Sequence, residues 1–84
     1  MNESHEVELS DLFLQQLKKL DPHQRKLVMK RIEKIAQQPL LGKPLTGGWK
    51  GYFSERLEHY RIIYKIVNDR VVLTEIGDRK NVYS

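Results

Sequence analysis

The sequence contains no cysteine among its 84 residues, which excludes disulfide bonds and thiolate metal sites. It also lacks any apolar run approaching the roughly 20 residues that a membrane-spanning helix needs. Its first residues carry Glu3, Glu6 and Glu8 where a secretion signal would have an apolar core. From these absences we expect a cytoplasmic protein with no membrane partner.

Metal-binding patterns are also missing. His5, His23 and His59 are scattered, and none of them lies at the spacing of metal ligands. A chain of 84 residues can form one small core but has no room for a separate cofactor domain. We therefore expect a single domain over residues 1–84, with no metal and no cofactor.

Positive charge is absent from the first eleven residues, which hold four acids and no lysine or arginine. The whole chain has 15 Lys+Arg and 11 Asp+Glu, so residues 12–84 hold 15 basic and 11 − 4 = 7 acidic side chains, a balance of +8. A basic surface of this kind attracts polyanions such as nucleic acids. The alternative is a solvated basic face with no ligand.

Two amphipathic helices are predicted in the first half. Ser10 is a favourable N-cap for a helix that carries Phe13, Leu17 and Leu20 on one face. Asp21 followed by Pro22 starts a second helix, because proline is tolerated at the first helical position. The buried stripe of this helix consists of Val28, Ile32 and Ile35, and Pro39 ends it.

The remaining segments alternate as strands do. They are residues 5–9, 51–57, 60–67 and 71–76, with a tight turn at Asn68-Asp69 and a glycine-rich loop over residues 39–51. The order is β-α-α-β-β-β. This order predicts an α+β fold in which the N-terminal strand and a two-helix hairpin pack on one face of a small antiparallel sheet.

The face without helices is expected to be basic. Alternation along 60–67 directs Tyr60, Ile62, Tyr64 and Ile66 to the core, which leaves Arg61 and Lys65 on the open face. The same parity adds Lys50, Tyr52, Ser54 and Arg56, and a C-terminal tail with Arg79, Lys80 and Tyr83 could fold over the end of this face.

Cations and tyrosines in this arrangement suit single-stranded RNA, because phosphates bind cations and unpaired bases stack on aromatic rings. They also suit metal-free RNA cleavage by the ribose 2′-hydroxyl, in which arginine stabilises the phosphoryl oxygens and a lysine or tyrosine accepts the proton.

Residues 39–84 resemble the C-terminal half of the RelE/ParE toxins of type II toxin–antitoxin systems. The shared features are a G-K-P-L-x-G loop (Gly42–Gly47), a strand ending in Arg56, a Y-R-I-I-Y strand (Tyr60–Tyr64) and a closing G-x-R-x-x-V-Y (Gly77–Tyr83). The N-terminal order, with the segment LKKLD at Leu17–Asp21, is similar as well. The resemblance extends over nearly the whole chain.

This resemblance implies a RelE-like activity, in which the toxin enters the ribosomal A site and cuts mRNA without a metal, leaving a 2′,3′-cyclic phosphate. It implies that Arg61 contacts the scissile phosphate, Arg79 stabilises the transition state, Tyr83 stacks or transfers a proton, and Arg56 grips RNA.

One feature departs from the best-studied relatives, which place two lysines on the strand before Arg56. The corresponding residues here are Tyr52 and Ser54, and Lys50 lies one strand repeat earlier. Other relatives use a glutamate, for which Glu55 and Glu58 are available. The proton acceptor therefore stays open.

Further expectations concern partners and alternatives. The resemblance implies a cognate antitoxin covering the basic groove, the ribosome and mRNA as targets, and operator DNA bound only through the antitoxin complex. The ParE branch implies instead a DNA gyrase poison, and a third possibility is a regulatory member with weak or no catalysis. Arg61 and Arg79 together favour the nuclease.

Overall fold

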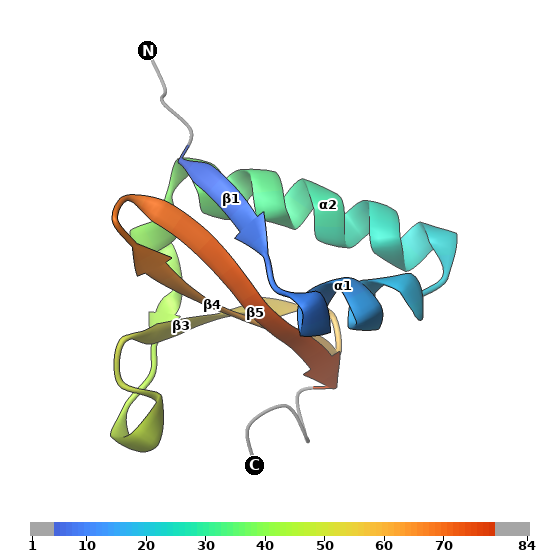
Figure 1. Cartoon of the computed structure of the whole chain (residues 1–84). Coiled ribbons are helices and arrows are strands. Elements are labelled where there is room, and N and C mark those ends of the chain that lie inside the picture. Colours follow the sequence, from blue (N-terminus) through green and yellow to red (C-terminus); the bar gives the residue numbers. More distant parts are fainter. Residues whose placement is uncertain (1–4, 79–84) are drawn as a thin grey trace.

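A computed structural model describes residues 5–78 (Figure 1). The elements are β1 (Glu6–Leu9), α1 (Asp11–Lys18), α2 (Pro22–Gln37), β2 (Lys43–Pro44), β3 (Tyr52–Leu57), β4 (Tyr60–Val67) and β5 (Arg70–Asp78), with short 3-10 turns η1 (Pro39–Leu41) and η2 (Gly47–Trp49). Within this described part, no helix has the length and apolarity to span a membrane.

Both helices begin where the capping residues predict. The Ser10 hydroxyl accepts a hydrogen bond from the Phe13 amide at 3.0 Å, and the Asp21 carboxylate accepts one from the Gln24 amide at 2.8 Å. Each bond satisfies an amide that the first helical turn leaves without a backbone partner. Pro22 is the first residue of α2, as expected.

The sheet contains five strands in the order β1-β5-β4-β3-β2. The predicted α+β arrangement is confirmed, with two additions. β1 runs parallel to β5, so the sheet is mixed rather than wholly antiparallel. A two-residue strand, β2, also lies within the predicted loop and pairs with β3. Parallel pairing needs a long connection, and the segment between β1 and β5 supplies one.

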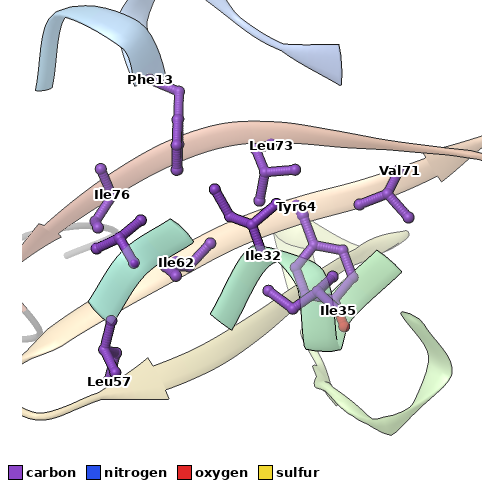
Figure 2. Close-up of a cluster of buried hydrophobic side chains, with 10 residues drawn as sticks. Phe13, Ile32, Ile35, Leu57, Ile62, Tyr64, Val71, Leu73 and Ile76 are labelled. Atoms are coloured by element: carbon purple, nitrogen blue, oxygen red, sulfur yellow. The ribbon is translucent and has the colours of Figure 1, made fainter. Parts of the chain in front are cut away.

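The core lies between the helical hairpin and one face of the sheet (Figure 2). The helical stripes contribute as predicted, since Phe13, Val28, Ile32 and Ile35 are all buried. Leu17 and Leu20 pack against them, partly buried. The sheet contributes Leu57, Ile62, Tyr64, Val71, Leu73 and Ile76.

The β4–β5 turn matches its sequence. Asn68 and Asp69 have φ values of 51° and 66°, so both occupy the left-handed region. Two successive left-handed residues form the turn whose twist matches a two-residue hairpin, and asparagine and aspartate tolerate this conformation best after glycine. The predicted hairpin is confirmed.

Tyr64 ties the 39–51 segment to the core. Its hydroxyl donates a 2.6 Å hydrogen bond to the Pro39 carbonyl, and its ring stacks on Phe53 with centroids 5.4 Å apart. Burial raises the pKa of Tyr64 to about 12, so the hydroxyl keeps its proton at physiological pH. Gly42 passes so close to this hydroxyl that a side chain there would overlap it.

We expect Gly42→Ala to lower the free energy of unfolding by about 1–3 kcal/mol, because the added methyl group displaces Tyr64 from its place in the core. Gly48→Ala is the matched control, since a methyl group at Gly48 meets no atom within 4 Å. Urea unfolding of both variants measures the difference. Equal stabilities would show that the Gly42–Tyr64 contact imposes no constraint.

Candidate functional site

The strand register separates the sheet into two faces. Directly opposed residues share a face in an antiparallel pair, and β3 and β4 oppose Tyr52 to Lys65, Ser54 to Ile63 and Arg56 to Arg61. None of these six residues belongs to the helix-side core cluster. We call the side of the sheet away from the helices the open face, and on it the structure brings together the predicted Tyr52, Ser54, Arg56, Arg61 and Lys65.

Arg56 and Arg61 form a directly opposed pair of cations at the end of this arrangement nearest the β3–β4 turn. Like charges at opposed positions repel, by an amount on the order of 0.2–1 kcal/mol. Arg56 is exposed and Arg61 is partly buried. An anion placed between the two guanidinium groups would relieve the repulsion, so this pair is suited to a phosphate.

Ser54 helps to orient Arg61. The serine is only 4% exposed, and its hydroxyl accepts a hydrogen bond from Nη1 of Arg61 at 3.2 Å. The Arg61 side chain is thereby directed back across β3, over the row of residues formed by Ser54 and Ile63. Ile63 is fully buried although it lies on the open face, so an apolar floor underlies the cations.

Aromatic rings lie at one end of the open face. Trp49 meets Tyr52 edge to face with centroids 5.3 Å apart, and the Lys65 ammonium lies 5.5 Å from the centre of the Tyr52 ring. Trp49 also borders a hollow of about 270 Å³ beside Lys43, Pro44, Leu45 and Thr46. Rings beside cations form a platform on which unpaired bases can stack.

Two lysines differ from the sequence prediction. Lys50 was assigned to the open face by parity, but β3 begins at Tyr52, and Gly51 with φ of 95° interrupts the extended run. Lys50 instead ends the η2 turn, exposed. Lys43 was missed, although it opposes Ser54 on β2 and so joins the open face. A strand of two residues offers no alternation from which to predict this.

The three tail residues Arg79, Lys80 and Tyr83 lie outside the described residues. Their predicted roles therefore stay predictions.

The two glutamates considered as proton acceptors lie away from the open face. Glu55 points to the helix side, where Arg31 Nη1 lies 2.8 Å and Lys34 Nζ 3.6 Å from its carboxylate. Arg31 also donates to the Arg56 carbonyl at 2.7 Å, so this cluster joins α2 to β3. Glu58 lies in the β3–β4 turn, exposed, with φ of 55°.

A carboxylate that the sequence analysis did not select faces the same way as Arg61. Glu75 opposes Ile63, and the neighbouring Ile76 points into the core. Burial raises the pKa of Glu75 above its ordinary value. Alternation alone could not place Glu75, because β5 contains a β-bulge, an extra residue that shifts the register between Ile63 and Tyr64 of β4.

Comparison with known proteins agrees with this fold. The family model described as ParE toxin of type II toxin-antitoxin system, parDE, matches residues 7–83. The chain therefore belongs to this family of type II toxins. A search of curated proteins finds no match.

Solved structures with the same fold include the RelBE2 toxin–antitoxin complex of Mycobacterium tuberculosis, with TM-score 0.84, 28% identity, and coverage of 92% of this chain and 100% of that chain. The archaeal RelE–RelB complex of Pyrococcus horikoshii has TM-score 0.78, 16% identity and coverage of 94% and 99%. The intact RelBE complex of E. coli has TM-score 0.76, 17% identity and coverage of 89% and 96%.

We expect Ser54→Ala to lower the free energy of unfolding by about 0.5–1.5 kcal/mol, because the partly buried Arg61 guanidinium loses a hydrogen-bond acceptor. Thr46→Ala is the control, since Thr46 is exposed and makes no side-chain capping bond. Chemical denaturation measures both. A Ser54→Ala variant as stable as the wild type would mean that this bond does not hold Arg61.

Proposed function

We propose that this toxin is a ribosome-dependent endoribonuclease that cuts mRNA in the A site without a metal. The 2′-hydroxyl of the ribose attacks the adjacent phosphorus, and the products are a 2′,3′-cyclic phosphate and a 5′-hydroxyl. The toxin thereby inhibits translation. Family membership and the RelE-like fold support the toxin class, and the chemistry of the open face supports the reaction.

The observation that carries the proposal is the opposed pair Arg56–Arg61. Negative charge builds up on the phosphoryl oxygens as the 2′ oxygen attacks, and two guanidinium groups held in advance can stabilise it. Arg61 is the better placed for the scissile phosphate, because Ser54 restrains it. Arg56 is exposed and suits a phosphate of the neighbouring nucleotide.

Tyr52, Trp49 and Lys65 would hold the bases and backbone beside the scissile bond. Lys43 and Lys50 extend the positive potential toward the β2 edge, where a strand of RNA could follow the surface. In the tail, Arg79, Lys80 and Tyr83 are proposed to complete the site.

A cognate antitoxin is the expected partner. The solved RelBE complexes of E. coli, M. tuberculosis and P. horikoshii pair a RelE-type toxin with an antitoxin. An acidic antitoxin segment on the open face would neutralise the Arg56–Arg61 pair and exclude RNA. Operator DNA would be bound only through that complex.

Arg61→Ala should lower the rate of mRNA cleavage on programmed ribosomes by about 10²–10³-fold, because the transition state loses a fixed guanidinium. The measurement is the mapping of mRNA 5′ ends after expression without antitoxin, followed by cleavage assays with purified toxin. Arg70→Ala is the matched control. Arg70 opposes Val67 on the same face as Arg61, but at the opposite, turn end of β5, where it pairs with Glu8 at 3.2 Å.

Codon-phased 5′ ends that disappear in Arg61→Ala but persist in Arg70→Ala are the expected result. Growth arrest without such ends would contradict the nuclease. Normal growth on overexpression, with antitoxin binding intact, would indicate a regulatory member without catalysis.

A second candidate, a poison of DNA gyrase, is favoured by the family model, which is named for ParE rather than RelE. In this case the open face would bind protein rather than RNA. Gyrase-dependent DNA breaks on expression, without phased mRNA ends, would establish this candidate in place of the nuclease.

A further inference from the structure

Glu75 is the only carboxylate on the open face among the described residues of β3, β4 and β5. It opposes Ile63, while Arg61 opposes Gly77 one pair further along. Glu75 and Arg61 are therefore diagonal neighbours on one face, with Cα atoms roughly 7–8 Å apart. The Arg61 guanidinium bonds Ser54 on β3, and Ile63 lies between Ser54 and Glu75, so a phosphate above Ile63 can meet the guanidinium while the adjoining ribose hydroxyl meets the carboxylate.

The backbone around Glu75 is fixed by a β-bulge. Ile63 opposes Glu75 and Tyr64 opposes Leu73, so Thr74 is the extra residue on β5. The Thr74 hydroxyl donates to the Ile63 carbonyl at 3.0 Å, which joins the bulge to β4. A bulge changes the direction in which the next side chain points, and here that side chain is Glu75.

Two side chains from the N-terminal part of the chain hold the other edge of the bulge. The Ser10 hydroxyl donates to the Thr74 carbonyl at 2.9 Å, and the Gln16 side-chain oxygen accepts from the Ile76 amide at 2.8 Å. Hydrogen bonds thus fix the residues on both sides of Glu75. β1 ends opposite Leu73, so these side chains satisfy backbone groups of β5 that have no strand beside them on that edge.

Proton chemistry separates Glu75 from the polar groups that β3 and β4 place on the open face. Lysine, arginine and tyrosine ordinarily hold their protons at neutral pH, whereas a carboxylate can accept one at once. Burial raises the pKa of Glu75, which makes it a stronger base than an exposed glutamate. Charged side chains on the elements packed against β5 are Arg61 and Lys65 on β4, Glu6 and Glu8 on β1, and Asp11 and Lys18 on α1, with Arg70 and Asp78 on β5 itself.

We propose that Glu75 is the general base of the RNA-cleaving site and that the Thr74 bulge aims it at the ribose 2′-hydroxyl. This assignment rests on the proposed nuclease function. The 2′ proton passes to the Glu75 carboxylate as the 2′ oxygen bonds to phosphorus. The bond from phosphorus to the 5′ oxygen breaks, the leaving oxygen takes a proton from solvent water, and Glu75 returns its proton to solvent. Arg61 holds the phosphoryl oxygens throughout.

Single-turnover cleavage of A-site mRNA by purified toxin on programmed ribosomes tests the assignment. Glu75→Gln should slow cleavage at neutral pH by about 10²–10⁴-fold, because the amide cannot accept the proton. The toxin concentration for half-maximal cleavage should stay unchanged. Glu33→Gln is the matched control, because Glu33 is exposed on α2, on the helix side of the sheet. The Glu33→Gln toxin should cleave at the wild-type rate.

The pH profile provides a second measurement that needs no substitution. The wild-type rate should fall as pH is lowered through the raised pKa of Glu75, because the base becomes protonated. Glu75→Gln should lack this fall. Thr74→Val, which removes the hydroxyl but keeps the shape, should slow cleavage less than Glu75→Gln and retain the wild-type dependence on pH.

Stability measurements separate a chemical effect from misfolding. The pKa of Glu75 is higher in the folded chain than in the unfolded one. Stability therefore falls as pH rises from the unfolded to the folded pKa, because the carboxylate becomes charged in a partly buried place. Glu75→Gln carries no charge and should be at least as stable as the wild type at neutral pH. Thermal unfolding measures this.

The outcomes distinguish the two proposals. Wild-type toxin that does not cleave overturns the nuclease function and the role of Glu75 with it. Wild-type cleavage that Glu75→Gln matches in rate overturns the assignment of Glu75 alone. A wild-type rate that does not fall at acidic pH overturns it too, even if Glu75→Gln fails to fold.

Discussion

Burial of the helical hairpin against a single face of the sheet is the constraint on which the rest of the molecule depends. Ten side chains form this core, and each fully buried aliphatic or aromatic residue contributes on the order of 1.5–3 kcal/mol. Repulsion between Arg56 and Arg61 costs far less. The fold therefore tolerates an unfavourable pair of charges on the open face, because its stability comes from the opposite side of the same strands.

In β3, alternation of side chains both anchors the strand to α2 and presents residues on the open face. Glu55 faces α2 and is held by Arg31, while its neighbours Ser54 and Arg56 face the other way. The ion pair is partly buried, so it joins the helix to the strand more firmly than an exposed pair would. The strand that carries Arg56 is thus anchored on the side of the sheet opposite the candidate site. Alternation along β3 therefore places Glu55 on the helix side, where it stabilises the fold, and Arg56 on the open face, in the candidate site.

Local signals in the sequence predicted most of the fold. Ser10 and Asp21 cap their helices, Pro39 follows the second helix, and Asn68-Asp69 forms the hairpin turn. Each depends only on residues close in sequence. The parallel pairing of β1 with β5 was not predictable in this way, because it joins residues more than sixty positions apart. β2 is too short to show any period.

The candidate site was predicted less completely for the same reason. Parity placed Arg61, Lys65, Tyr52, Ser54 and Arg56 together because the pairing of β3 with β4 is regular throughout. It misplaced Lys50, where Gly51 breaks the strand, and it gave no means of selecting Glu75. The Thr74 bulge depends on partners from Ser10 and Gln16. These contacts join residues about sixty positions apart, so no short segment of the sequence contains both partners.

The strand order has a consequence for the timing of folding during synthesis. β1 is joined to the rest of the sheet only through β5, and Ser10 and Gln16 bond to residues of that same strand. β1 is synthesised first, but it can pair only after β5 (residues 70–78) has been synthesised. Contacts between segments so far apart form late in folding, since the intervening chain must be ordered first. A nascent copy therefore cannot complete its sheet until almost all of its strands have been translated.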